Sequence, residues 1–130
     1  MDGKPTPVIP GGMAEPAGHY SHAVTCGGLV YISGQLPIAP DGTKLASEPF
    51  AKQAAQALAN VEAILDTAGA SVSSLVQVRI YIADIGLWPD FNEIYARWCG
   101  QAKPARAVVP VPHLHYGCAL EIEAVAAIIA

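Results

Sequence analysis

Three charged side chains stand in otherwise apolar, strand-like sequence between Lys103 and Glu123, and they restrict how this chain can fold. They are Arg106, Glu121 and Glu123, and they lie among Val, Leu, Ile and Ala residues. Burying a charged group without a partner costs far more free energy than burying an apolar one. These side chains therefore either pair with one another in the fold or bind something from outside the chain.

The chain has the size of one domain, and residues 1–130 are expected to form a single unit. Hydrophobic residues make up 52% of the sequence and charged residues 14%, with a mean hydropathy of +0.35. A compact α/β or α+β unit of this composition has more apolar surface than its own core can cover. We therefore expect the chain to form oligomers.

The charge balance disfavours a nucleic-acid-binding protein. Seven Lys and Arg residues oppose eleven Asp and Glu residues, for a net charge of −4, and no basic run with interleaved aromatic residues is present. No apolar run reaches the roughly 18 residues of a membrane span, and the polar, Pro- and Gly-rich N-terminus lacks the apolar core of a signal peptide. The sequence predicts a soluble, cytoplasmic protein.

The cysteines and histidines give no sign of a metal centre. Cys26, Cys99 and Cys118 are too widely spaced for a disulfide framework or a zinc motif, and none stands in a nucleophile motif. Since Cys behaves as a small hydrophobic residue by default, buried free thiols are expected. His113 and His115 form an H-x-H pair, but no third ligand of suitable spacing accompanies them, so no metal site is expected.

Turn residues and apolar periodicity predict an α+β fold with the order β-β-α-β-α-β-β. Residues 1–18 are rich in Pro and Gly and should form an extended arm, part of which can pair as an N-terminal edge strand. Helices that alternate with strands favour one sheet with both helices packed on one face. Strands are expected over residues 20–25, 29–33, 75–83, 105–111 and 119–129, and helices over residues 47–69 and 89–100.

Two of these elements carry more detailed expectations. The first helix should be capped by Ser47 and should keep its polar side, which includes Gln53, in solvent. The alternation of the third strand should bury four side chains on one face, namely Val76, Val78, Ile80 and Ile82.

The charged residues of the last two strands are the main candidates for chemistry. An arginine binds a carboxylate through two parallel hydrogen bonds and stays charged in a dry pocket, so Arg106 is a candidate anchor for an acid. The alternative is an internal ion pair with Glu121 or Glu123. The two glutamates are two apart in a strand and share a face, and partial burial would raise the pKa of a carboxyl toward neutrality, where it can exchange protons with a water.

Two uncharged residues are weaker candidates, because each has a structural explanation too. Gly34 at the end of a strand either lets a ligand approach the backbone or only permits a bend. Asn92 stands next to the apolar stripe of the second helix, where a solvated or capping role is more common than a ligand contact.

Six short motifs follow one another along nearly the whole chain, and together they are specific. They lie at residues 18–21 (GHYS), 29–36 (LVYISGQL), 78–84 (VRIYIAD), 91–95 (FNEIY), 104–106 (PAR) and 120–126 (LEIEAVA). This ordered set resembles the reactive intermediate deaminase family, RidA, formerly called YjgF. The resemblance implies a chorismate mutase-like α+β fold, a homotrimer with clefts between subunits, and hydrolysis of reactive enamines or imines, such as 2-aminoacrylate, to a 2-keto acid and ammonia. It implies no cofactor and no metal.

The resemblance also assigns roles to single positions. Arg106 matches the arginine that binds the substrate carboxylate, and Glu121 matches the glutamate that positions the attacking water. Tyr20 and Asn92 match positions that line the cleft. Gly34 and Val108 are expected to act through their backbone groups.

The chain departs from the family pattern at residues 110–117 (PVPHLHYG), which replace a more usual acidic and basic stretch. His19 and His22 stand where Pro and Gln are common, at the expected rim of the cleft. Substrate preference is expected to depend on these segments. Two other functions stay open: a module that binds a small carboxylate without turnover, and a ribonuclease, which the negative charge and the missing basic groove make the least favoured.

Overall fold

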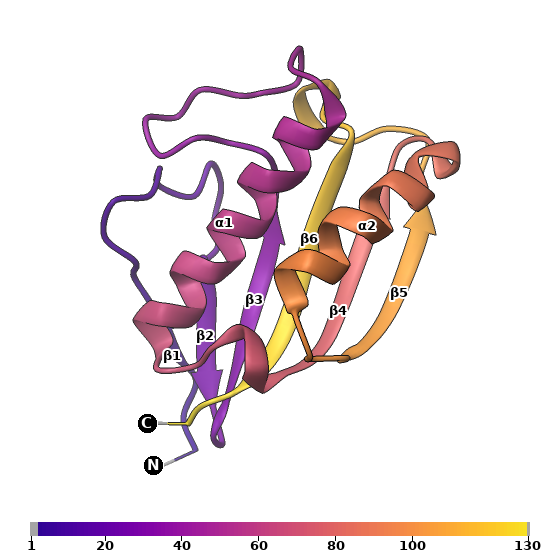
Figure 1. Cartoon of the computed structure of the whole chain (residues 1–130). Coiled ribbons are helices and arrows are strands. Elements are labelled where there is room, and N and C mark those ends of the chain that lie inside the picture. The colour runs from indigo at the N-terminus through magenta and orange to yellow at the C-terminus, as the bar shows by residue number, and fades with distance from the viewer. Residues whose placement is uncertain (1–2, 130) are drawn as a thin grey trace.

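A computed structural model, which describes residues 3–129, contains one mixed six-stranded sheet with two helices on one of its faces (Figure 1). The strands are β1 (Thr6–Val8), β2 (Ala23–Cys26), β3 (Leu29–Gln35), β4 (Leu75–Ile82), β5 (Ala105–Pro110) and β6 (Leu120–Ala127). The helices are α1 (Phe50–Ala68) and α2 (Trp88–Cys99), and three short 3-10 turns are η1 (Val72–Ser74), η2 (Ile85–Leu87) and η3 (His115–Gly117).

The last strand of the chain lies in the middle of the sheet. The strand order is β1-β2-β3-β6-β4-β5, with β4 and β5 parallel and every other neighbouring pair antiparallel. Since β3 and β4 both run antiparallel to β6, they are parallel to each other, and α1 and α2 each connect a pair of parallel strands. The predicted element order and the placement of both helices on one face are confirmed, and β1 is the expected edge strand.

The core lies between the helices and the covered face of the sheet. On the sheet side the alternation is strict from Val78 onward, and Val78, Ile80 and Ile82 are 1%, 0% and 0% exposed. Val78 and Ile80 belong to one buried cluster with side chains of β6 and with apolar side chains of both helices, such as Leu58, Leu65 and Phe91.

The prediction that Val76 is buried is wrong, because the β4–β6 register shifts between Leu75 and Gln77. Such a bulge places one extra residue in the strand and turns the following side chains over. Val76 is therefore 48% exposed while Leu75 is buried.

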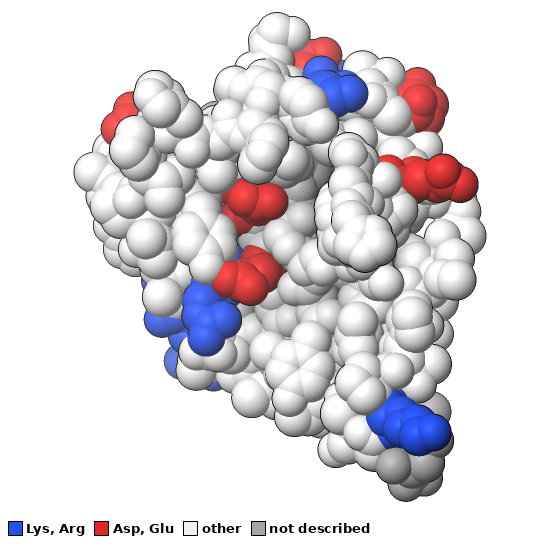
Figure 2. Space-filling view, turned by 180° about the vertical axis from the view of Figure 1, so that it is seen from behind, with Lys and Arg blue, Asp and Glu red and all other residues white. Residues whose placement is uncertain are grey.

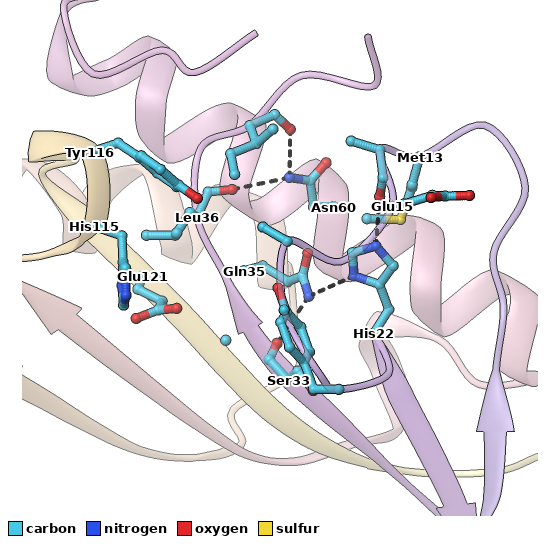
Figure 3. Close-up of a pocket in the computed structure, with 16 residues that line it drawn as sticks. Met13, Glu15, His22, Ser33, Gln35, Leu36, Asn60, His115, Tyr116 and Glu121 are labelled. Carbon is cyan, nitrogen blue, oxygen red and sulfur yellow. Dashed lines mark hydrogen bonds between the residues drawn. The ribbon is translucent and has the colours of Figure 1, made fainter. Parts of the chain in front are cut away.

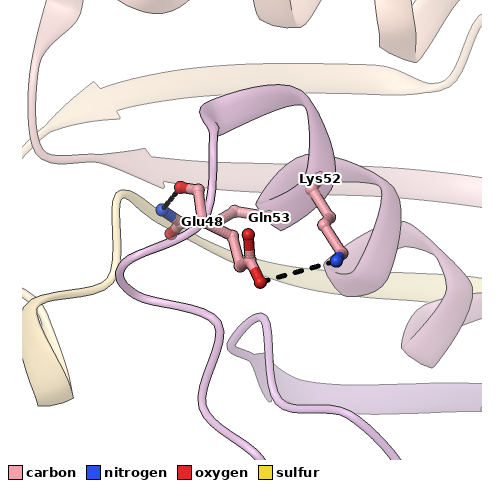
Figure 4. A network of polar contacts seen from close by, with 3 residues as sticks. All are labelled: Glu48, Lys52 and Gln53. Carbon is pink, nitrogen blue, oxygen red and sulfur yellow. Dashed lines mark hydrogen bonds and ion pairs between the residues drawn. The ribbon is translucent and has the colours of Figure 1, made fainter.

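The start of α1 differs from the prediction in two ways. Pro49 and not Ser47 occupies the N-cap position, and no side chain caps the helix. Gln53, expected in solvent, is 4% exposed: its amide donates to the carbonyl oxygens of Ala46 (3.2 Å) and Glu48 (3.0 Å), the latter drawn in Figure 4. Its Oε1 accepts from the backbone N–H of Ala119 (2.9 Å). Gln53 thus ties the loop before α1 to the beginning of β6.

The other element ends lie close to their predicted positions. Gly69 ends α1 in the left-handed conformation, with φ 79°. β2 begins at Ala23 and not at Tyr20, because the chain before it bends: Ser33 donates to the carbonyl oxygens of Ser21 and His22. The three thiols are free, and the expectation that all are buried holds for Cys99 and Cys118 but not for the half-buried Cys26.

The second face of the sheet carries no helix and is only partly polar (Figure 1). It presents Tyr31, which is 47% exposed, the half-buried Val109 and Val125, and the two glutamates of β6. Figure 2 shows this face from behind, with acidic atoms at a hollow in a mostly uncharged surface. Among residues 3–129 no helix has the length and hydropathy needed to span a membrane.

Candidate functional site

Glu121 and Gly34 meet on the uncovered face of the sheet. The β3–β6 register shifts between Ile32 and Gln35, and this bulge brings the backbone of Gly34 against the Glu121 side chain. A Cβ at position 34 would lie 2.5 Å from Glu121 Oε2 and 2.8 Å from its Cδ, closer than real Cβ atoms come to a neighbour. The structural explanation of Gly34 is confirmed, since a bulge lies here, and the absence of a side chain also leaves room for Glu121. That a ligand approaches the backbone of Gly34 stays a prediction.

A pocket of about 490 Å³ opens around this carboxylate (Figure 3). Its walls come from the N-terminal arm, the end of β3, α1 and the η3 turn. They include Met13, Tyr20, Gly34, Leu36, Ile38, His115, Tyr116 and Glu121. Tyr20 is 50% exposed and belongs to the rim, as the sequence predicted for a residue lining a cleft.

The environment of Glu121 favours its neutral form. Burial raises the pKa of its carboxyl, the charge of Glu123 raises it further, and His115 acts in the opposite direction. No described residue donates a hydrogen bond to the carboxylate. A half-buried, unpaired carboxyl with a raised pKa can accept a proton from a bound water and return it.

Glu123, two residues further along the same strand, has partners within the chain. Its Oε1 accepts a hydrogen bond from the Tyr81 hydroxyl and lies 3.8 Å from Arg79 Nη1. The hydrogen bond to Glu123 raises the pKa of Tyr81. The two glutamates share a face, as predicted, but only Glu121 is free to act on a ligand.

Arg106 lies on the opposite, helix-covered face of the sheet. Its Nη1 donates to Asn92 Oδ1 of α2 at 2.8 Å, and its guanidinium carbon lies 5.1 Å and 5.2 Å from the ring centroids of Trp88 and Tyr95. A hydrogen bond and two aromatic faces fix the plane of the guanidinium. Arg106 lines a second pocket of about 360 Å³ with Asn92, Tyr95 and Lys103.

The alternative roles considered for Arg106 and Asn92 are wrong. No carboxylate of the described chain pairs with Arg106, whose register partner is Val78, whereas Glu121 pairs with Tyr81 on the other face. Asn92 is half-buried and accepts from Arg106, so it is neither a solvated nor a capping residue.

The structure therefore divides the predicted site residues into two groups. Tyr20, Gly34 and Glu121 lie together in the first pocket, and Asn92 and Arg106 in the second. Val108 follows Arg106 on the covered side of β5, where its side chain is half-buried against the core. Within one chain, no single small ligand could contact both Arg106 and Glu121 from opposite faces of a sheet.

Asn60 and His115 line the first pocket although the sequence did not assign them to it, whereas His22 was expected at the rim of the cleft. Asn60 is 5% exposed and donates to the carbonyl oxygens of Leu36 (3.1 Å) and Ile38 (3.0 Å), which holds the loop after β3. His22 contacts Ala14 O of the arm through Nε2 at 2.7 Å. For His115 the sequence offered only an indirect indication, namely its place in residues 110–117, which depart from the family pattern. Among residues 3–129 no group of three or more His, Cys, Asp or Glu side chains could hold a metal ion.

Comparison with known proteins agrees with this fold. The family described as Endoribonuclease L-PSP matches residues 12–128. The human protein named 2-iminobutanoate/2-iminopropanoate deaminase is 40% identical over 109 residues, which are 84% of this chain and 80% of the human one.

Solved structures with the same fold extend the comparison. A Yersinia pestis structure, described as YyfA of the conserved Rid protein family, is 33% identical, with a TM-score of 0.91 over 95% of this chain and 99% of the other. Escherichia coli TdcF with bound serine is 32% identical, with a TM-score of 0.87 over 94% and 98% of the two chains.

The chain belongs to this family, the RidA (YjgF) family, and its sheet with two helices on one face is the chorismate mutase-like α+β fold. The resemblance inferred from the ordered motifs is confirmed.

Proposed function

We propose that this protein is a hydrolytic deaminase of reactive enamines and imines of the 2-aminoacrylate and 2-iminopropanoate type, and that it yields a 2-keto acid and ammonia. The observation that carries the proposal is the state of two charged residues. Among the described residues neither Arg106 nor Glu121 forms an ion pair, and both line pockets. Hydrolysis of an imino acid requires two groups: an arginine that can bind the substrate carboxylate, and a carboxylate that can hold the attacking water.

The working form in this proposal is a cytoplasmic homotrimer, with each cleft built by two subunits. The opposite placement of Arg106 and Glu121 supports this, because a neighbouring chain can bring its Glu121 to the Arg106 of the first. The uncovered sheet face, with Tyr31 and Val125, offers apolar surface for such an interface. No cofactor, metal, membrane or nucleic acid has a role in it.

In the cleft, Arg106 binds the substrate carboxylate and Asn92 holds the guanidinium in its plane. The rigid clamp sets the distance between the imine carbon and the partner subunit's Glu121. Tyr20 closes the rim. Gly34 and Val108 present backbone groups to the ligand, and Gly34 also leaves the space that Glu121 occupies.

The reaction needs little more than position and one proton acceptor. Glu121 holds a water against the imine carbon and takes its proton as the C–O bond forms. The tetrahedral intermediate then expels ammonia and leaves the keto acid. Because such imines also hydrolyse unaided, a modest reduction of the barrier is sufficient.

The direct test generates the unstable substrate within the assay mixture. A dehydratase generates 2-aminoacrylate from serine, and the formation of pyruvate is followed with and without this protein. We expect faster pyruvate formation in proportion to the added protein. A rate that does not change with added protein would contradict the proposal.

The bound serine in TdcF favours a second candidate, a protein that binds a small amino or keto acid without turnover. The two candidates differ in their need for Glu121. Replacing Glu121 by Ala should abolish hydrolysis and leave acid binding intact if the protein is an enzyme. Ribonuclease activity, suggested by the family's description, is least supported, because the chain is acidic and its sequence has no run of basic residues.

The space at Gly34 gives a specific prediction. In Gly34→Ala the new Cβ would overlap the Glu121 carboxylate, and because that side chain is flexible it should move while the fold persists. We expect a rate of imine hydrolysis lower by about 10-fold or more and a free energy of unfolding within about 1 kcal/mol of the original. Steady-state kinetics and denaturant unfolding measure the two quantities.

Gly11→Ala is the matched control, since its Cβ would meet nothing within 4 Å. It should leave both the rate and the stability unchanged. An unchanged rate in Gly34→Ala would mean that the present position of the Glu121 carboxylate is not needed.

A further inference from the structure

The η3 turn beside the first pocket contains a strained residue. Tyr116 has φ 63° and ψ 10°, and it is the only non-glycine residue with positive φ among residues 3–129. The left-handed conformation is unfavourable for an L-amino acid, because it places Cβ too close to the following carbonyl oxygen. Strain of this kind persists only when the surrounding contacts hold it, and it often accompanies a functional site.

Several contacts hold the turn in this conformation. The ammonium of Lys44 lies 4.7 Å from the centroid of the Tyr116 ring. The backbone N–H of Gly117 donates to Leu114 O, and that of Cys118 to His115 O, both at 3.2 Å. Cys118 is 1% exposed and anchors the end of the turn in the interior. The turn is therefore fixed at both ends.

The turn places the imidazole of His115 beside the carboxylate of Glu121. Both residues line the same pocket, their charges interact, and Figure 3 shows the ring next to the carboxylate. The His115 side chain is exposed, and neither ring nitrogen has a hydrogen-bond partner among the described residues. The imidazole is free to exchange a proton with a ligand at Glu121.

The charges around His115 are mostly negative. Glu121 interacts with it from β6, Glu123 lies two residues further along the same face, and Lys44 is the nearby cation, directed at the ring of Tyr116. The arm contributes Glu15, Tyr20 and His22 across the pocket, and Cys118 follows in the chain, whereas β3 and α1 contribute only uncharged side chains such as Gln35 and Asn60.

We propose that His115 is a second catalytic residue of this site, the acid that protonates the departing nitrogen while Glu121 acts on the water. The inference rests on the proposed deaminase function. A carbinolamine cannot readily lose its nitrogen as an amide anion, so a proton donor at the nitrogen speeds the second half of the reaction. Histidine is the side chain that most readily supplies such a proton near neutral pH.

The protons and electrons of this sequence balance. Water adds to the protonated imine: the C–O bond forms, the C=N π electrons move to nitrogen, and the water's proton goes to Glu121. The imidazolium of His115 then protonates the amino group, and the C–N bond breaks with its electron pair on nitrogen, which leaves as ammonia. The carbonyl oxygen returns its proton to His115, and Glu121 gives its proton to ammonia. The products are a keto acid and an ammonium ion, and both residues regain their starting state.

The test compares His115→Ala with the original protein in the imine assay across pH, after subtraction of the uncatalysed rate. We expect the catalysed rate to fall at least about 10-fold. The pH dependence of the catalysed rate should differ between the two proteins, because the variant lacks the proton-donating imidazole. Because position 115 is open to solvent, added imidazole should restore part of the lost rate, which a purely structural role would not allow.

His113→Ala is the matched control, since His113 lies in the same segment, is exposed and does not line the pocket. It should behave as the original protein, and circular dichroism should show that both variants fold. An active original protein with an equally active His115→Ala variant overturns this inference alone. A loss of rate that imidazole does not reverse also overturns it, because His115 would then only position other groups. An inactive original protein overturns the proposed function, and this inference with it.

Discussion

Replacing Glu121 by Gln should lower the rate of imine hydrolysis by about 100-fold or more, because an amide cannot take a proton from the attacking water. Glutamine has nearly the same shape, so the pocket and the contact with Gly34 should persist. The rate of the original protein should decline as the pH falls through the pKa of Glu121, which burial raises above its usual value. Rates measured across pH, in parallel for both proteins, test this.

The free energy of unfolding should depend on pH in the opposite sense to the rate. A carboxyl whose pKa is higher in the folded than in the unfolded chain stabilises the fold fully only below its unfolded pKa, and that contribution is lost as the pH rises through the folded value. Glu121→Gln removes this loss, so at neutral pH it should be at least as stable as the original protein. Unfolding by denaturant at two pH values shows whether a loss of activity has a structural cause.

Glu123→Gln is the matched control on the same strand and face. Glutamine can still accept the hydrogen bond of Tyr81, and the negative charge that helps to raise the pKa of Glu121 is removed. The variant should remain active, and its rate of imine hydrolysis should begin to fall at a lower pH than that of the original protein. If Glu123→Gln were as inactive as Glu121→Gln, the distinction between the two glutamates would be wrong.

Replacing Arg106 by Lys should lower kcat/KM for an imino acid by about 100-fold, although the charge is kept. The guanidinium donates to Asn92 and still has further donors in the same plane for a carboxylate, whereas an ammonium is a point charge on a flexible stem. Lysine would also lose the contacts with the rings of Trp88 and Tyr95. Affinity for a keto acid product, measured by calorimetry, should fall together with kcat/KM.

Arg97→Lys, on the exposed side of α2, provides the control for a conservative change of cation. It should leave catalysis and acid binding unchanged. Normal affinity of Arg106→Lys for the acid would show that the carboxylate binds elsewhere.

The sequence predicted the elements well because their signals are local. The alternation from Val78 to Ile82 and the glycine at position 69 are each readable from a few neighbouring residues. The bulge that exposes Val76 is different, since it depends on the register with β6. Gln53 was misplaced for a similar reason: its buried position follows from the backbone N–H of Ala119, which is distant in sequence.

For the candidate site, the sequence indicated residues but not their geometry. Arg106 and Glu121 stand out as charges in apolar strands, and the ordered motifs assign them roles. Their opposite faces follow from the register of β4 with β5 and with β6, which no local pattern encodes. His115 was overlooked as a site residue because its position depends on the left-handed turn at Tyr116, an unusual conformation for that residue type.

In the proposed trimer each active cleft takes Arg106 from one chain and Glu121 from another. Mixing two inactive variants is a direct test of this arrangement. Arg106→Ala and Glu121→Ala are each purified, then unfolded and refolded together in equal amounts, with each variant refolded alone as a control. A cleft is intact when its arginine comes from one variant and its glutamate from the other, so random assembly into a cyclic trimer restores about a quarter of the clefts. About a quarter of the original activity should therefore return in the mixture. A mixture as inactive as its two components would contradict this arrangement.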